Sequence, residues 1–194
     1  RILQAIGRLG EQIIDLEELA CHKGSVLGVL PDCPQPSQKM FESRLLSVLQ
    51  GLDPTRPVYV EAESRKIGTL QLPTALIETM RAGKCVHIEA SLAARVDFLL
   101  RDYDYFLNAP EWLKARLQPL RNLQSTETIV RWGTYVHDGL WRELVSELLQ
   151  LHYDPLYSRS QQQNYAGFSA PLTLSSDDLT PAGIEALARR VCAG

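Results

Sequence analysis

Two carboxylates, a hydroxyl and an arginine directly follow a short apolar stretch in residues 58–68, which read VYVEAESRKIG. Glu61 and Glu63 are separated by one residue, so in an extended chain their side chains share a face. Open α/β sheets bind ligands at the carboxyl ends of their strands. An apolar strand that ends in an acidic residue is typical of a Walker B segment, whose carboxylate holds Mg²⁺. The block alone is equally typical of a solvated loop in which Glu63 pairs with Arg65 or Lys66.

A second polar group, His22, Lys23, Gly24 and Ser25, follows an earlier apolar stretch after a short turn. A lysine and a histidine beside a glycine can form an anion site, because glycine lets the backbone approach the ligand. The group does not match the P-loop pattern G-x-x-x-x-G-K-[ST]. For a motif this short, a surface turn with a solvated Lys23 is the favoured interpretation.

Two further segments carry groups that suit a phosphate. Residues 35–38, which read QPSQ, open an expected helix whose free N–H groups can receive an anion, although simple capping is the commoner role. Arg95 and Arg101 lie on a later expected helix, where they could reach a phosphate as lid residues do in nucleotide kinases. Surface exposure or ion pairing is the more common role of such arginines.

The composition is that of an ordinary soluble globular protein, with 45% hydrophobic and 22% charged residues. A net charge of −3 argues against a uniformly basic nucleic-acid-binding surface, and no apolar run approaches a membrane span. The cysteines Cys21, Cys33, Cys85 and Cys192 form no C-x-x-C pair, so neither a zinc ribbon nor a disulfide framework is indicated. We expect reduced thiols in a cytoplasmic protein.

Short apolar stretches alternate with helical patterns over the first hundred residues. Expected helices begin near residues 2, 37, 73 and 91, and expected strands cover residues 12–16, 57–60 and 85–89. Helical patterns alone follow to residue 151, then a turn at 153–157, a strand near 171–174 and a last helix. We expect an α/β core over 1–101 with a mostly parallel sheet, a helical insertion over 102–152, and a return to the core over 153–194.

The expected insertion contains three tryptophans, Trp112, Trp132 and Trp141, among many leucines. We expect these rings to fill the core of the insertion, because large apolar side chains are mostly buried. Lining an apolar channel is the alternative.

In their order along the chain, these blocks resemble the tRNA 2-selenouridine synthase family. The resemblance runs from Arg1 to about Tyr157 and is densest up to Gly68. It rests on Asp15-Leu16-Glu17, Ala20, His22-Lys23-Gly24-Ser25, Gly28, Gln35-Pro36-Ser37-Gln38, Phe41-Glu42, Glu61-Ala62-Glu63-Ser64-Arg65-Lys66-Ile67-Gly68, Leu72-Pro73, Arg95-Val96, Tyr103 and Tyr153-Asp154-Pro155-Leu156-Tyr157. The ordered set is specific, whereas each block alone is weak.

Members of this family join an N-terminal rhodanese-like domain to a C-terminal P-loop domain, and the chain resembles the second. The resemblance implies a P-loop NTPase-like, three-layer α/β domain with a helical insertion, which lacks its first strand and P-loop. It also implies a transferase that replaces sulfur by selenium in 2-thiouridine at the tRNA wobble position. Selenophosphate is then the selenium donor, and geranyl diphosphate gives an S-geranylated intermediate. Without the rhodanese cysteine and the P-loop, we expect the chain alone to be inactive.

The resemblance also implies roles for single residues. Glu61, Glu63 and Arg65 are the expected catalytic residues, with Glu61 as a magnesium ligand. Binding of phosphate or of the modified uridine is expected from His22, Lys23, Gly24, Ser25, Gln35, Ser37, Gln38, Ser64 and Arg95. Mg²⁺ is the expected cofactor, with no bound metal cluster. The expected partners are tRNA and the rhodanese domain of the same protein, with no membrane, and the apolar insertion is expected to accommodate the geranyl chain.

The sequence departs from the family pattern at two places. Ala62 stands where an aspartate is common, which leaves one carboxylate fewer for a metal, and Val26-Leu27 replaces a small-then-aromatic pair. A P-loop nucleotide kinase or ATPase is the competing enzyme. A non-catalytic tRNA-binding module is a third candidate, which the net charge of −3 disfavours.

Overall fold

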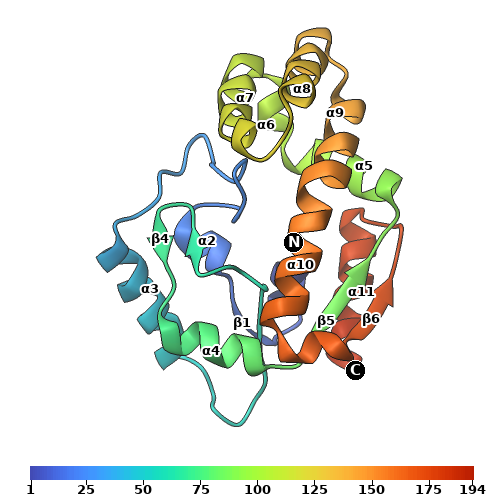
Figure 1. Cartoon of the computed structure of the whole chain (residues 1–194). Coiled ribbons are helices and arrows are strands. Elements are labelled where there is room, and N and C mark those ends of the chain that lie inside the picture. Colours follow the sequence, from blue (N-terminus) through green and yellow to red (C-terminus); the bar gives the residue numbers. More distant parts are fainter. The chain divides into compact units, whose positions relative to one another are not determined.

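The computed structural model describes residues 1–194, which form two compact units. Unit 1 combines Arg1–Glu89 with Asn164–Gly194, and unit 2 is Ala90–Gln163. Unit 1 contains α1 (Ile2–Arg8), β1 (Gln12–Ile14), α2 (Leu16–Ala20), α3 (Gln38–Gln50), β2 (Val58–Val60), β3 (Lys66–Ile67), β4 (Leu70–Gln71), α4 (Thr74–Ala82), β5 (Val86–Glu89), a 3₁₀ turn (Ala166–Ser169), β6 (Leu172–Ser175) and α11 (Pro181–Ala193) (Figure 1).

Unit 1 has two parallel strand pairs and one hairpin. β1 pairs with β2, with Gln12 opposite Val58, and β5 pairs with β6, with Val86 opposite Leu172. The predicted mixed α/β class with parallel strands is therefore confirmed. The antiparallel pair of β3 and β4 was not expected, and its two-residue turn relies on Gly68, whose φ of 59° suits glycine.

The expected strand over residues 12–16 is too long. The carboxylate of Asp15 accepts a hydrogen bond from the backbone N–H of Glu18 at 2.8 Å, and this cap starts α2 at Leu16. β1 therefore ends at Ile14, and the acidic residues that follow it lie in a cap and a helix rather than in a strand.

The core of unit 1 is built by α2, α3, the hairpin and α4. Its most deeply buried side chains are Leu16, Phe41, Leu45, Ile67 and Ile77, each at most 2% exposed. The helix α1 packs against β1, β2 and α11, and α11 also contacts β6. The helix α1 thus packs on the first parallel pair, and its partner helix α11 packs on the second.

Unit 2 is entirely helical. It contains α5 (Leu92–Asp102), α6 (Asp104–Leu107), α7 (Pro110–Leu117), a 3₁₀ turn (Gln118–Asn122), α8 (Thr126–Asp138), α9 (Trp141–Leu148), a π-helical turn (Leu149–Tyr153) and α10 (Asp154–Asn164). The unit is longer at both ends than the expected insertion over 102–152. Ion pairs between Arg95 and Asp154 and between Arg142 and Asp97 explain this, because they tie α5 to α9 and α10.

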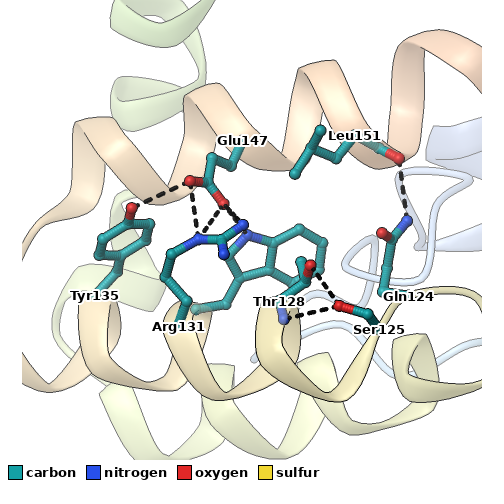
Figure 2. A network of polar contacts seen from close by, with 8 residues as sticks. Gln124, Ser125, Thr128, Arg131, Tyr135, Glu147 and Leu151 are labelled. Carbon is teal, nitrogen blue, oxygen red and sulfur yellow. Dashed lines mark hydrogen bonds and ion pairs between the residues drawn. The ribbon is translucent and has the colours of Figure 1, made fainter.

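The expected turn at residues 153–157 is helical. A π-helical turn leads directly from α9 into α10, and Pro155 lies in the first turn of α10. Proline lacks an N–H, so the carbonyl of Leu151, four residues earlier, loses its usual helical donor. The side chain of Gln124 donates to that carbonyl at 3.0 Å instead (Figure 2).

A single carboxylate organises the contact between α8 and α9. Glu147 accepts hydrogen bonds from Arg131, from the indole of Trp132 at 3.0 Å and from the hydroxyl of Tyr135 at 3.1 Å (Figure 2). Trp132 is fully buried, whereas Trp112 and Trp141 are half-buried. The structure therefore supports a role in filling the core most clearly for Trp132.

The cysteines depart from the expectation of four free thiols. Cys21 and Cys33 are joined by a disulfide, with their Cα atoms 5.5 Å apart, whereas Cys85 and Cys192 are free. Cysteine spacing does not reveal the pair, because residues 22–32 fold back on themselves through bridges of His22 with Val29 and of Leu30 with Cys33. No helix in the structure combines the length and the apolar character needed to cross a membrane.

Candidate functional site

Acidic side chains meet at the carboxyl ends of β1 and β2. Ile14 lies opposite Val60 in the parallel register, so the next residues, Asp15 and Glu61, emerge at the same edge. Asp15 is held by α1, since the side chain of Gln4 donates to its carboxylate at 3.2 Å. This edge is where an open α/β sheet places a ligand.

Glu61 has one satisfied and one unsatisfied carboxylate oxygen. Its Oε1 accepts the backbone N–H of Glu17 at 2.8 Å, whereas its Oε2 is buried without a hydrogen-bond partner. Burial raises the pKa of Glu61 to about 8, with smaller contributions from the charges of Asp15 and Glu17, although two backbone N–H groups act in the opposite direction. An orphaned oxygen on a buried carboxylate is the kind of group that a cation or a donor completes.

Glu17 joins this cluster, although it was not among the predicted site residues. Burial and the charge of Glu63 raise its pKa to about 7, against the lowering effect of the charge of Lys23. The only sequence signal for it was its place in the block that begins at Asp15. Periodicity assigned it no role, because its contact with Glu61 joins segments 44 residues apart.

Glu63 lies against the loop that contains Gly24. A Cβ atom at position 24 would overlap the Glu63 carboxylate, and the φ of 69° at Gly24 also favours glycine. Ser64 donates its backbone N–H to Glu63 at 3.3 Å, but burial dominates and raises the pKa of Glu63. The predicted blocks around residues 24 and 63 are therefore brought together.

Backbone hydrogen bonds define the loop at residues 22–28. The N–H of Lys23 donates to Gly28 at 2.8 Å, and Ser25 and Gly28 close further turns at 2.7 and 2.8 Å. His22 is 4% exposed, and its ring lies where a side chain at position 28 would be. The charge of Lys23 reaches the acidic cluster, since it lowers the pKa of Glu17. The favoured interpretation of a plain surface turn is thus incomplete.

Gln35 anchors the hairpin to the end of α2. Its amide nitrogen donates to the carbonyl of Ile67 at 2.9 Å, and its oxygen accepts the N–H of Thr69 at 2.9 Å. A side chain on Gly68 would overlap this amide. The polar atoms of Gln35 are therefore engaged by the protein itself.

The polar side chains at the start of α3 are likewise bonded to the backbone of the protein itself. Gln38 exchanges two hydrogen bonds with the backbone of Gln71, at 2.8 and 2.9 Å, and Ser37 caps the helix by accepting the N–H of Met40. The structure thus gives both residues an anchoring and capping role, which was the alternative to phosphate binding.

The side chains of the remaining predicted residues make no contact with the carboxylates of the acidic cluster. The hydroxyl of Ser64 donates to the carbonyl of Lys66 at 2.6 Å, and the side chain of Arg65 is exposed, with no hydrogen bond or ion pair. Arg95 belongs to unit 2, where it pairs with Asp154. Of the predicted residues, Glu61, Glu63, Lys23 and Gly24 form the shared site.

The raised pKa values of Glu17 and Glu61 make the stability of unit 1 depend on pH. A folded-state pKa above the ordinary 4.5 means that the folded protein binds more protons than the unfolded chain. This contribution is complete below about pH 4.5 and is lost as the pH rises through the folded values of about 7 and about 8. We expect the free energy of unfolding, measured by urea titration without divalent cations, to fall over this range.

Replacing Glu61 with glutamine should reduce that slope, because the amide does not titrate. Replacing the exposed Glu18 with glutamine should leave the slope unchanged. Equal slopes in the wild type and in E61Q would contradict the burial of a neutral Glu61.

The chain is similar in sequence to the proteins of one known family. The model of the family described as the tRNA 2-selenouridine synthase AAA domain matches residues 2–124. An AAA-type domain has a P-loop NTPase-like fold, which agrees with the parallel strand pairs. No solved structure matches the chain significantly.

Several curated relatives bear the name tRNA 2-selenouridine synthase. The protein of Nitrosomonas europaea is 34% identical over 61% of this chain and 32% of its own length. That of Cupriavidus pinatubonensis is 46% identical over 46% of the chain and 25% of its own length. That of Shewanella denitrificans is 30% identical over 80% of the chain and 50% of its own length.

The chain matches between 25% and 50% of the length of these relatives, which are therefore much longer proteins. The family match nevertheless covers most of the chain and includes every residue of the acidic edge. The chain therefore belongs to the tRNA 2-selenouridine synthase AAA domain family.

Proposed function

We propose that this chain is the part of a tRNA 2-selenouridine synthase that holds a phosphate-bearing substrate at the carboxyl edge of β1 and β2. The observation that carries this proposal is the buried Oε2 of Glu61, which has no partner in the protein. The other oxygen of Glu61 accepts the N–H of Glu17, whose carboxylate interacts with the charges of Glu63 and Lys23, and Glu63 lies against the Gly24 loop. A carboxylate, a cation and a glycine turn at one strand edge suit a phosphate with its counter-ion.

The proposed fold is a three-layer P-loop domain whose first strand and P-loop come from a part of the protein before residue 1. The two parallel pairs each leave strand edges unpaired, and α1, which contacts the first pair, packs against α11, which contacts β6 of the second, so a further parallel strand would join the pairs into one sheet. The helix α1 begins at Ile2, and the side chain of Gln4 on it bonds to Asp15 at the acidic edge. A P-loop directly before Arg1 would therefore reach the acidic edge.

The residues at this edge fit a Mg²⁺ ion that is held by one protein carboxylate and otherwise by waters and substrate phosphates. No group of three or more His, Cys, Asp or Glu side chains is arranged to hold a metal ion. Mg²⁺ is usually held by one or two carboxylates together with waters and substrate phosphates, and Glu61 supplies one such carboxylate. The bound ion would neutralise phosphate oxygens. Glu63, Lys23 and the backbone of Gly24 would orient the substrate around it, with Ala62 contributing no side-chain oxygen.

The activity proposed for the whole protein is a transferase reaction on cytoplasmic tRNA. It would replace the sulfur of 2-thiouridine at the wobble position by selenium, with selenophosphate as donor and geranyl diphosphate forming an S-geranylated intermediate. The names of the relatives support tRNA modification and selenouridine synthesis. The rhodanese domain would act in the same protein, and the helical unit 2 would accommodate the geranyl chain.

The test compares group transfer with nucleotide hydrolysis in the full-length protein. We expect Mg²⁺-dependent geranyl transfer to tRNA that contains 2-thiouridine, then selenium incorporation from selenophosphate, with no rapid ATP hydrolysis in the absence of tRNA. Mass spectrometry of the digested tRNA and phosphate release measure the two activities. Rapid ATP turnover without tRNA, together with no geranyl transfer, would instead establish the nucleotide kinase or ATPase.

A further inference from the structure

The segment between β2 and β3 holds the acidic side chains but is not a regular element. Residues 61–65 lie outside any strand or helix. Within the segment, the N–H of Glu63 donates to the carbonyl of Glu61 at 2.8 Å, and Ser64 bonds only to its close neighbours. Such a turn needs anchors from elsewhere, because irregular backbone without them is mobile.

Besides the backbone bond from the N–H of Leu72 to the carbonyl of Arg65, two anchors reach this segment from more distant parts of the chain, and Tyr165 supplies one of them. Its hydroxyl donates to the carbonyl of Glu63 at 2.8 Å, across 102 residues of sequence. The other is the bond from the N–H of Glu17 to Glu61. The turn from Glu61 to Glu63 is therefore held at both of its ends by the rest of unit 1.

The ring of Tyr165 is itself fixed. It is 8% exposed and belongs to the hydrophobic core of unit 1, with Phe168 packed beside that core. Burial is the main cause that raises the pKa of its phenol, and the charge of Glu63 adds to it, which keeps the hydroxyl protonated and able to donate. A donor on a rigid ring holds the carbonyl that it bonds.

We propose that Tyr165 is a positioning residue for the acidic edge: through the Glu63 carbonyl it fixes the turn that aims the Glu63 carboxylate at the Gly24 loop. The inference rests on the function proposed for this edge. No sequence pattern indicates this role, because Tyr165 lies beyond the blocks that resemble the family and beyond the family match, which ends at residue 124. Tyr165 touches no reacting atom and acts through Glu63.

The test replaces Tyr165 with phenylalanine, which keeps the ring and removes the hydroxyl. Y135F is the matched control, because Tyr135 also donates one hydrogen bond, to Glu147 in unit 2. In the full-length protein we expect Y165F to weaken binding of magnesium pyrophosphate about threefold to tenfold, the effect of one hydrogen bond. The kcat of geranyl transfer should fall by a similar factor with the KM for tRNA unchanged, and Y135F should alter neither.

Hydrogen exchange separates this inference from the proposed function. The amides of Glu63 and Ser64 should exchange faster in Y165F than in the wild type or in Y135F, whether or not pyrophosphate binds. If wild-type protein binds no pyrophosphate but Y165F still loosens this turn, the positioning inference stands and the proposed function fails. Unchanged exchange at residues 61–65 in Y165F, or equal affinity and kcat in Y165F and the wild type, would overturn the positioning role.

Discussion

Replacing Glu61 with glutamine is expected to slow geranyl transfer by the full-length protein by about a hundredfold or more, the usual loss when a group that stabilises transferred phosphate charge is removed. The amide keeps the shape of the side chain and an oxygen that can accept the N–H of Glu17. It cannot ionise, whereas the proposed contact of Mg²⁺ with the unpartnered oxygen of Glu61 requires the deprotonated carboxylate. Single-turnover rates for geranyl transfer and selenium incorporation, assayed separately, measure the effect.

Stability distinguishes lost chemistry from lost folding in this variant. A neutral amide is less costly to bury than a carboxylate, so E61Q should unfold at the same temperature as the wild type or higher, at pH values where Glu61 is charged. Glu185→Gln is the control, because that carboxylate lies on the exposed face of α11, paired with Arg189. Rates within twofold of the wild type for E61Q would remove Glu61 from the site.

Replacing Glu147 with leucine should have the largest effect on stability, a loss of about 2 kcal/mol in the free energy of unfolding of unit 2. The ion pair with Arg131 contributes little of this, because its partners are 24% and 42% exposed. The main cost falls on the indole N–H of Trp132, a fully buried residue that would lose its acceptor (Figure 2). Chemical denaturation followed by tryptophan fluorescence measures the change.

The same carboxylate predicts a response to acid. Burial alone would raise the pKa of Glu147, but hydrogen bonds from Arg131, Trp132 and Tyr135 outweigh it and lower the pKa. A lowered folded pKa gives stability that is present above about pH 4.5 and is lost as the pH falls through the folded value. Glu143→Leu, one turn earlier on the exposed face of α9, is the matched control. Equal losses in E143L and E147L would show that the network does not stabilise the unit.

Patterns along the sequence predicted the elements whose cause is local. The helix that begins after Ser37, the strand before Glu61 and the helix that begins after Thr180 all depend on caps and apolar spacing within a few residues. Three features were missed: the hairpin at Gly68, the π-helical turn before Asp154 and the disulfide of Cys21 with Cys33. The first two depend on backbone geometry that spacing does not reveal, and the third on a loop that folds back.

The sequence predicted those residues of the candidate site that a local pattern indicates and missed those that depend on long-range contacts. Glu61 and Glu63 follow an apolar strand, which a local pattern indicates, and the structure brings Glu63 to Gly24. Gln35 looked like a ligand from its place near a helix start but is engaged by the hairpin backbone. Glu17 and Tyr165 were missed, because their contacts with the turn at residues 61–65 join distant segments that no periodicity connects.

The order of the two units along the chain has a consequence for synthesis on the ribosome. Unit 2 is one continuous stretch, whereas unit 1 needs Asn164–Gly194 to supply β6, α11 and Tyr165. All of unit 2 therefore leaves the ribosome before unit 1 is complete, and β5 waits without its partner strand while the helices behind it fold. Domains usually fold as they emerge, and an unpaired strand is open to wrong partners. Released chains that end just after residue 163 should therefore hold a folded unit 2 and an unfinished unit 1.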